Sequence, residues 1–223
     1  MLSQIICLGN VQSEGCRVLI WDETVGFLTG ALLSKTPSSA LLVNVHPDRQ
    51  MQVSGLMYYN LDEGTRARLH PLPLDSLASL LDPSTEADVF VETGETDPER
   101  LAIQHYRFEQ RQARKQLMQS LLSSAAFDAL VIATQRTDPL PILTSLAPLL
   151  RPSAKLVIYS TWREMLLPTF VEVRQAVEWV DVELHESFLR PYQAAPGRMH
   201  PVMNCNGHAG TILSATKAIP MPK

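Results

Sequence analysis

Short runs of apolar, mostly β-branched residues alternate along the chain with longer stretches of helical periodicity. The short runs predict strands at residues 17–21, 40–45, 53–59, 89–91, 129–133, 155–159, 180–184 and 211–216. The longer stretches predict helices at 26–33, 75–81, 98–124, 140–150 and about 168–177. Strands that alternate with helices are typical of βαβ units, so we predict an α/β fold with a mainly parallel sheet. The last two strands have no long helix between them, and we expect them to form an antiparallel edge pair.

The composition narrows the class of protein. Of the 223 residues, 45% are hydrophobic and 19% are charged, which suits a globular protein and excludes collagen-like, disulfide-scaffold and wholly disordered chains. The formal net charge of −4 argues against a broadly basic nucleic-acid binder but leaves room for local basic patches. No apolar run approaches the roughly 18 residues of a membrane-spanning helix. The three cysteines include no pair at C-x-x-C spacing, so no metal site is predicted.

Charges are unevenly distributed on the two sides of residue 100. Residues 82–99 contain seven acidic residues and no basic one, and we interpret them as a loop or insertion within a single domain that spans residues 1–223. Residues 100–115 contain five basic residues and one acidic residue. The arginines of this segment share one face of the predicted helix; they are Arg100, Arg107, Arg111 and Arg114. That face either follows an RNA backbone or is simply solvated.

The first strand and the turn after it have the spacing of a cofactor loop without its glycines. In doubly wound folds the ligand lies at the carboxyl ends of the strands, close to the first βα turn. The general methyltransferase pattern has an acid on the strand and then three glycines at alternate positions. The corresponding residues here are Ile20, Asp22, Thr24 and Gly26. Side chains at Asp22 and Thr24 project into space that a cofactor needs, and Asp22 with Glu23 repels a carboxylate-bearing ligand. The turn is therefore either a degenerate cofactor site or a structural loop that never bound a ligand.

Two further strand ends carry no catalytic pattern. Residues 44–46 read Asn-Val-His, with no acid at the usual ribose-binding place. Asp138 follows the strand at 129–133, beside the position that a target base takes in active methyltransferases, but a role as the cap of the next helix is favoured. No catalytic residue is predicted.

Two long segments, together with the turn at residues 22–24, resemble a known family. The first comprises residues 127–133, 137–143, 149–153 and 156–160; the second comprises 189–193, 196–204 and 207–210. They resemble the non-catalytic subunit of the eukaryotic tRNA adenine-N1 methyltransferase, which pairs with a catalytic sister to methylate an adenosine of the tRNA T-loop. The likeness runs over about residues 1–217. Ala209 and Thr211 depart from the family pattern, and the family's N-terminal β-rich domain is absent from this sequence.

The resemblance implies a Rossmann-like class I methyltransferase fold that binds no S-adenosylmethionine, the cofactor being expected only in the partner subunit. It implies a nuclear tRNA-processing complex, typically a heterotetramer, whose partners are a catalytic methyltransferase subunit and tRNA, with no membrane and no DNA. The alternatives are an active S-adenosylmethionine-dependent RNA methyltransferase with an atypical loop, and a structural ribonucleoprotein component.

Candidate tRNA-binding or interface residues lie in two places. Near the C-terminus they surround the turn at residues 196–197: Arg190, Tyr192, Gln193, Arg198 and His200. Arginine suits bidentate contacts with phosphate, although the same polar groups equally suit an irregular loop held against the sheet. The second place is the basic helix, with Arg107, Arg111 and Arg114.

Overall fold

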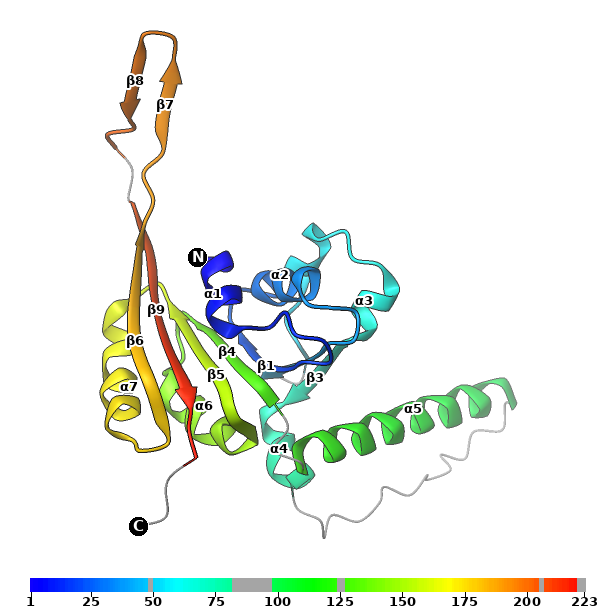
Figure 1. The fold of residues 1–223 in the computed structure, drawn as a ribbon. Helices are drawn as coiled ribbons and strands as arrows, with labels where there is room; N and C mark the ends of the chain where they lie inside the picture. Colours follow the sequence, from blue (N-terminus) through cyan, green and yellow to red (C-terminus); the bar gives the residue numbers. More distant parts are fainter. Residues whose placement is uncertain (48–49, 82–97, 124–126, 205–206, 220–223) are drawn as a thin grey trace.

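A seven-stranded sheet forms the centre of the molecule in the computed structural model, which describes residues 1–47, 50–81, 98–123, 127–204 and 207–219 (Figure 1). Its order is β3–β2–β1–β4–β5–β9–β6. The strands are β1 (Arg17–Asp22), β2 (Leu41–His46), β3 (Leu69–Pro73), β4 (Phe127–Thr134), β5 (Leu150–Ser160), β6 (Trp179–Phe188) and β9 (His208–Lys217). β3, β2, β1, β4 and β5 are parallel, while β9 runs antiparallel to both β5 and β6. The predicted α/β class and antiparallel edge pair are confirmed.

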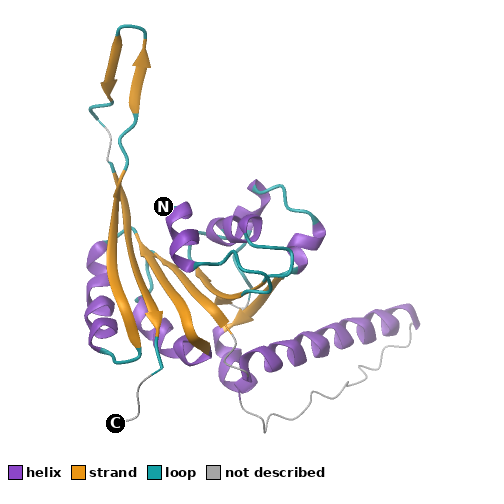
Figure 2. Cartoon of the chain, viewed as in Figure 1, coloured by secondary structure: helices purple, strands orange, loops and turns teal. Residues whose placement is uncertain are grey.

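Helices cover both faces of the sheet (Figure 2). One face packs against α1 (Leu2–Gly9) and α2 (Phe27–Lys35), and α3 (Glu63–Ala67) lies beside α2. The other packs against α4 (Leu74–Leu81), the end of α5 (Pro98–Ser123), α6 (Pro139–Leu146) and α7 (Arg163–Gln175). Two short 3₁₀ helices, η1 (Ser54–Tyr58) and η2 (Ala147–Leu149), complete these elements.

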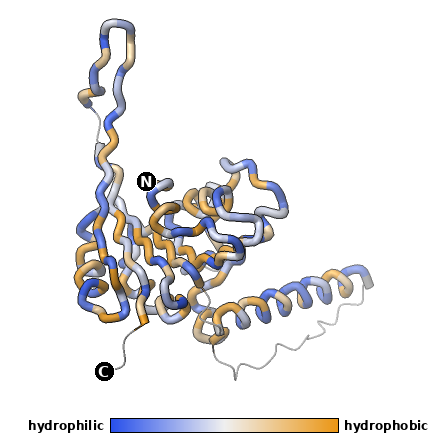
Figure 3. The backbone as a smooth tube through the Cα atoms, in the orientation of Figure 1, coloured by the Kyte–Doolittle hydropathy of each residue, from blue (hydrophilic) through white to orange (hydrophobic). Residues whose placement is uncertain are grey.

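The central strands are apolar on both sides because both faces are covered. In β1, Val18 and Ile20 face the α1–α2 layer, whereas Leu19 and Trp21 face the opposite layer. All four are at most 2% exposed. Continuous apolar runs of this kind are what a parallel sheet between two helical layers requires, and Figure 3 shows the hydrophobic residues gathered in these strands.

The third strand is not where the sequence pattern predicts it. Residues 53–59, predicted as a strand, contain the 3₁₀ helix η1, and the third strand is β3. β3 was not predicted because prolines such as Pro71 and Pro73 are rare within strands. It lies at the edge of the sheet, where a residue without an N–H group is tolerated.

Several other boundaries differ from the prediction. α7 begins at Arg163, with Pro168 inside it, because its buried side chains Leu166, Thr169 and Val173 hold the helix against the sheet. α6 ends at Leu146, and α1 was not predicted. The strand predicted at 89–91 and most of the acidic segment, residues 82–97, lie outside the described residues; Glu99 belongs to the first turn of α5.

Two elements project from the body of the molecule (Figure 1). β6 and β9 lead into a two-stranded hairpin made of β7 (Tyr192–Ala195) and β8 (Arg198–Pro201). We call residues 188–204 the arm. The second projection is α5, whose 26 residues make a helix about 39 Å long.

Candidate functional site

The carboxylate of Asp22, at the end of β1, is bonded to the start of α2. It accepts hydrogen bonds from the backbone N–H and the hydroxyl of Thr24, at 2.7 and 2.5 Å. It also accepts them from the backbone N–H and the hydroxyl of Thr29, at 2.9 and 2.7 Å. A turn that approaches a ligand through glycine backbone presents free N–H groups. Here the chain's own carboxylate takes up such donors.

The other polar groups of the turn extend this network. The Thr24 hydroxyl oxygen accepts a bond from the N–H of Leu28 at 2.9 Å. The buried Asn44 side chain, on β2, donates to the Thr29 hydroxyl at 3.0 Å. Thr24, which stands where the pattern has a glycine, and Asn44 of the second strand are therefore both hydrogen-bonded to α2.

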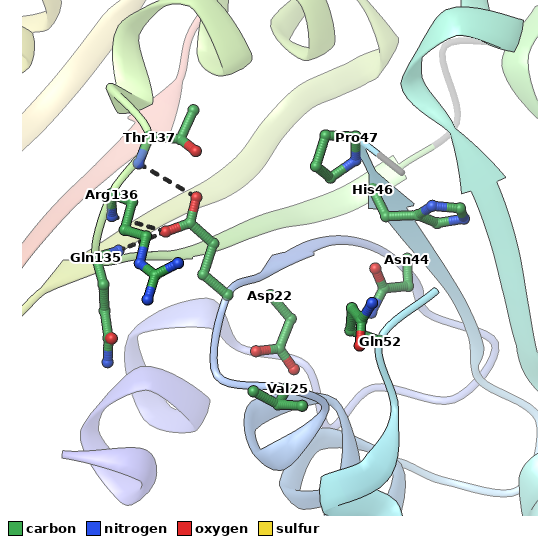
Figure 4. A pocket seen from close by; sticks show the side chains of 10 residues that line it. Asp22, Val25, Asn44, His46, Pro47, Gln52, Gln135, Arg136 and Thr137 are labelled. Carbon is green, nitrogen blue, oxygen red and sulfur yellow. Dashed lines mark hydrogen bonds between the residues drawn. The ribbon is translucent and has the colours of Figure 1, made fainter. Parts of the chain in front are cut away.

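Glu23 fills a concave group of backbone amides at the end of β4. Its carboxylate accepts bonds from the N–H groups of Gln135 at 2.7 Å, Arg136 at 2.8 Å and Thr137 at 3.3 Å (Figure 4). Successive N–H groups that converge in this way form an anion-binding nest. Burial by itself raises the pKa of Glu23, but the hydrogen bonds from Thr137, Gln135 and Arg136 outweigh it, so the pKa lies below its usual value.

The backbone of the turn is strained, and η1 packs against it. Val25 has a φ of 59°, which is unusual for a β-branched residue, and Gly26 has a φ of 91°. The N–H of Gly55 donates to the carbonyl of Val25 at 2.8 Å, so η1 lies directly on the turn. A Cβ added at Gly26 would be 2.9 Å from the Cα of Val53. The glycine is needed here for contact with the chain's own backbone.

A cavity of about 360 Å³ remains at the carboxyl ends of β1, β2 and β4. Most of the residues that line it have polar side chains, and they come from these strand ends and from the segment before η1: Asp22, Glu23, Val25, Asn44, His46, Pro47, Gln52, Gln135, Arg136 and Thr137 (Figure 4). This is the point of an open α/β sheet where ligands bind, and the volume is at the small end of ligand sites. Ile20, by contrast, is buried against the α1–α2 layer and is not among the residues that line the cavity.

The predicted residues of the C-terminal group lie together on the arm. Arg190, Tyr192, Gln193, Arg198 and His200 are all exposed. Across the hairpin Gln193 pairs with His200. The Arg190 guanidinium lies 5.2 Å from the centre of the Phe188 ring, a cation–π contact. The interpretation of this segment as an irregular loop held against the sheet is wrong, because the hairpin stands away from the sheet (Figure 1).

The basic residues of α5 form a second, separate group. Arg107, Arg111 and Arg114 are exposed, and α5 projects from the opposite side of the molecule to the arm (Figure 1). The structure therefore does not combine the two predicted groups into one patch. Asp138 caps α6 by accepting a bond from the N–H of Leu140 at 3.0 Å, which confirms its structural role.

Sequence reasoning missed two features of these sites. Residues 135–137 lie more than 110 positions from Glu23, and no local signal indicates that it bonds their amides. The hairpin, by contrast, had a signal, because Pro196-Gly197 is a turn dipeptide between two extended segments. Among the described residues no group of three or more potential metal ligands was found, and no described helix is long and apolar enough to cross a membrane.

A model of the Gcd10p family matches residues 1–105. A tRNA (adenine(58)-N(1))-methyltransferase non-catalytic subunit from Debaryomyces hansenii is 27% identical over 98% of this chain and 46% of its own length. The Schizosaccharomyces pombe subunit of the same name is also 27% identical, over 98% of this chain and 55% of its own length. The Mus musculus subunit is 22% identical over 96% and 54%. The chain is similar in sequence to these non-catalytic subunits. The resemblance predicted from the sequence is confirmed, and the chain spans about half the length of these curated relatives.

Solved structures confirm the predicted fold. A SAM-dependent O-methyltransferase from Thermotoga maritima superposes with a TM-score of 0.65 at 17% identity, over 100% of this chain and 66% of that protein. The tRNA (m1A58) methyltransferase from Aquifex aeolicus gives a TM-score of 0.60 at 11% identity, over 98% and 69%. The fold is therefore the Rossmann-like class I methyltransferase fold.

Proposed function

We propose that the chain is a non-catalytic subunit that binds tRNA and supports a catalytic sister subunit in methylating the T-loop adenosine. The observation that carries this proposal is the self-bonded turn of Asp22, Glu23 and Thr24, at the place where the fold binds its ligands. The names of its homologues, which describe non-catalytic subunits of this methyltransferase, support the same assignment.

The residues of the corner do not fit S-adenosylmethionine. The Asp22 side chain takes the space and the N–H groups that a glycine turn would offer, and Glu23 occupies the amide nest. Two carboxylates at the site also repel the carboxylate of the cofactor. We therefore assign no catalytic step to this chain and place the cofactor in the partner subunit. No observation favours an active enzyme or a ribonucleoprotein component.

The arm supports the proposed association with a catalytic partner. Its large apolar side chains are exposed: Phe188, Leu189, Tyr192, Met199 and Met203, the last at 82%. Exposed apolar groups that gather on one projecting element mark an interface. Arg190 and Arg198 beside them suit phosphate contacts or polar contacts at the rim of that interface. The assembly that we propose is a nuclear heterotetramer with two copies of each subunit and no membrane or DNA partner.

Coexpression with a catalytic sister subunit tests this function. We expect the two chains to copurify and to methylate a tRNA transcript together, while neither does so alone. Replacing residues 190–203 by a short glycine turn removes no buried residue, since all of them are exposed or half-buried. The variant chain should therefore keep its melting temperature while its affinity for the partner falls at least tenfold.

A matched control is Val177→Ala, since Val177 is also exposed, at 81%, but lies away from the arm. This variant should bind the partner as the unmodified chain does. Methylation by the catalytic subunit alone at the full rate would contradict the proposed function. Full partner affinity without the arm would contradict only the assignment of the interface.

A further inference from the structure

α5 is attached to the body by its C-terminal turns. Met118, Leu121 and Leu122 are buried against the sheet and α4, whereas most of the preceding residues of the helix are exposed. A 26-residue helix with so little burial gains little stability from packing. Its outer turns therefore present most of their side chains, Tyr106 and Arg107 among them, at the surface.

A groove of about 520 Å³ runs between α5 and the segment formed by α3 and β3. α5 contributes Gln110, Ala113, Arg114 and Leu117; the opposite wall consists of Glu63, Arg66, Ala67, Leu69 and His70. The helical residues are spaced by three, one and three positions, so they face the groove together. The walls thus combine cationic and amide donors with apolar surface.

The charges in this groove are mostly of one sign. Arg66 and Arg114 are exposed at its two walls, and His70 is half-buried between them. Burial first, and then the nearby Arg114 guanidinium, lower the pKa of His70. Cationic groups that face one another across a groove repel until an anion lies between them. Glu63 is the acidic residue of the lining, and it offers acceptor oxygens of the kind that bond ribose hydroxyls.

The same face of α5 continues outward beyond the groove. Tyr106 lies four residues before Gln110 and is 63% exposed, and Arg107 is beside it. An exposed aromatic ring next to arginines is the combination on which unpaired bases stack while their phosphates are neutralised. The groove and this extension together cover about three turns of the helix.

We propose that the groove lined by Arg66, His70, Gln110 and Arg114 is an RNA-binding site, in which the two arginines hold backbone phosphates and Tyr106 stacks on an unpaired base. This inference rests on the proposed function, since it names where tRNA contacts this chain. RNA is favoured over an acidic peptide because Leu69 and Leu117 in the lining and the exposed Tyr106 offer apolar surface to flat bases, which a run of carboxylates would leave unused.

The test uses the chain copurified with its catalytic partner and an unmodified tRNA transcript. Fluorescence anisotropy gives the dissociation constant between 50 and 300 mM salt. For the double variant Arg66→Glu with Arg114→Glu we expect at least tenfold weaker binding and a salt dependence reduced by roughly 1.5 in log–log slope, as for two lost phosphate contacts. Ultraviolet cross-linking followed by mass spectrometry should recover nucleotides on Tyr106.

The matched control is Lys35→Glu with Arg174→Glu, which changes the net charge equally on exposed residues of α2 and α7. It should weaken binding less than twofold. Equal effects of the two double variants, or cross-links confined to other elements, would overturn the assignment of the groove as an RNA-binding site and leave the proposed function intact. A complex that does not bind tRNA would overturn both. Capture of an acidic peptide with unchanged tRNA affinity would assign the groove to a protein partner instead.

Discussion

At the scale of single residues, the two carboxylates at the end of β1 have different roles. Asp22 closes its own turn and the start of α2, within seven residues. Glu23 crosses from β1 to the amides that follow β4 and so joins the two halves of the sheet at the point where the strand order reverses. In a fold that otherwise holds a ligand at this point, Glu23 supplies the anion from within the chain.

The substitution Glu23→Gln tests this role of the Glu23 carboxylate by its effect on the free energy of unfolding. The amide oxygen is a weaker acceptor than a carboxylate and its NH₂ group faces donors, so the free energy of unfolding at pH 7 should fall by about 1–3 kcal/mol. Urea denaturation followed by circular dichroism measures it. Glu172→Gln, at an exposed position of α7, is the control and should change stability by less than about 0.5 kcal/mol.

The difference in unfolding free energy between the unmodified chain and Glu23→Gln should depend on pH in a definite direction. The folded-state pKa of Glu23 lies below that of the unfolded chain, about 4.3. The stabilisation is therefore fully present above that value and is lost as the pH falls through the folded-state pKa. The gap between the unmodified chain and Glu23→Gln should be constant from pH 7 to 5.5 and shrink toward pH 3.5. A gap that grows on acidification would contradict the role assigned to the carboxylate.

The sequence predicted the absence of the glycines at this scale, but only part of what replaces them. Asp22 and Thr24 lie in the cofactor pattern itself, so their identity was informative. The bonds of Glu23 to residues 135–137 depend on the pairing of β1 with β4, which no local pattern encodes. The RNA or interface roles of the arginines stay predictions, since position and exposure do not reveal a ligand.

At the scale of elements, α2 and η1 depend on close backbone approach. A Cβ added at Gly30, in α2, would lie 2.3 Å from the ring of Tyr59, whose hydroxyl donates to the carbonyl of Phe27 at 2.9 Å. The ring also lies 5.6 Å from that of Phe27. This packing holds the segment of η1 on the turn that contains Asp22.

Gly30→Ala should therefore destabilise the protein although alanine is the better helix former. We expect a loss of about 1–3 kcal/mol from the displaced ring, against a gain of about 1 kcal/mol in propensity. Gly64→Ala, in α3, is the matched control: its new Cβ would meet only the Asp62 carboxylate, at 3.6 Å, so it should be neutral or stabilising. Thermal unfolding of the two variants measures the contrast, and equal shifts would contradict the packing.

The elements that are buried on both sides were predicted best from the sequence. β1, β2 and β4 are apolar on both sides and were predicted to within two residues, because a covered parallel strand has a distinctive composition. β5 begins five residues before its predicted start, because residues 151–153 are exposed and lack that composition. β3 was missed because its prolines are acceptable only at an edge, and the edge is a property of the whole sheet. The two tyrosines and the methionine of 53–59 resembled a strand, although Met57 is 73% exposed on η1.

At the scale of the whole molecule, the fold separates an internally bonded corner, with its small cavity, from two outward surfaces. The corner at the ends of β1, β2 and β4 is bonded internally, while the arm and α5 project from opposite sides (Figure 1). This arrangement underlies our proposal that the chain holds a catalytic partner and an RNA and takes no catalytic step itself. Whether residues 1–223 form a single domain stays an interpretation, since the homologues are about twice as long.

The number of S-adenosylmethionine sites in the reconstituted complex tests this account most directly. Equilibrium binding of the labelled cofactor should give one site per catalytic subunit, and calorimetric titration of this chain alone should give no heat of binding. When the glycines of the catalytic subunit's first turn are replaced, no site should remain in the complex. A second site that survives that replacement, or micromolar binding by this chain alone, would contradict the proposal that Asp22 and Glu23 keep S-adenosylmethionine from binding to this chain.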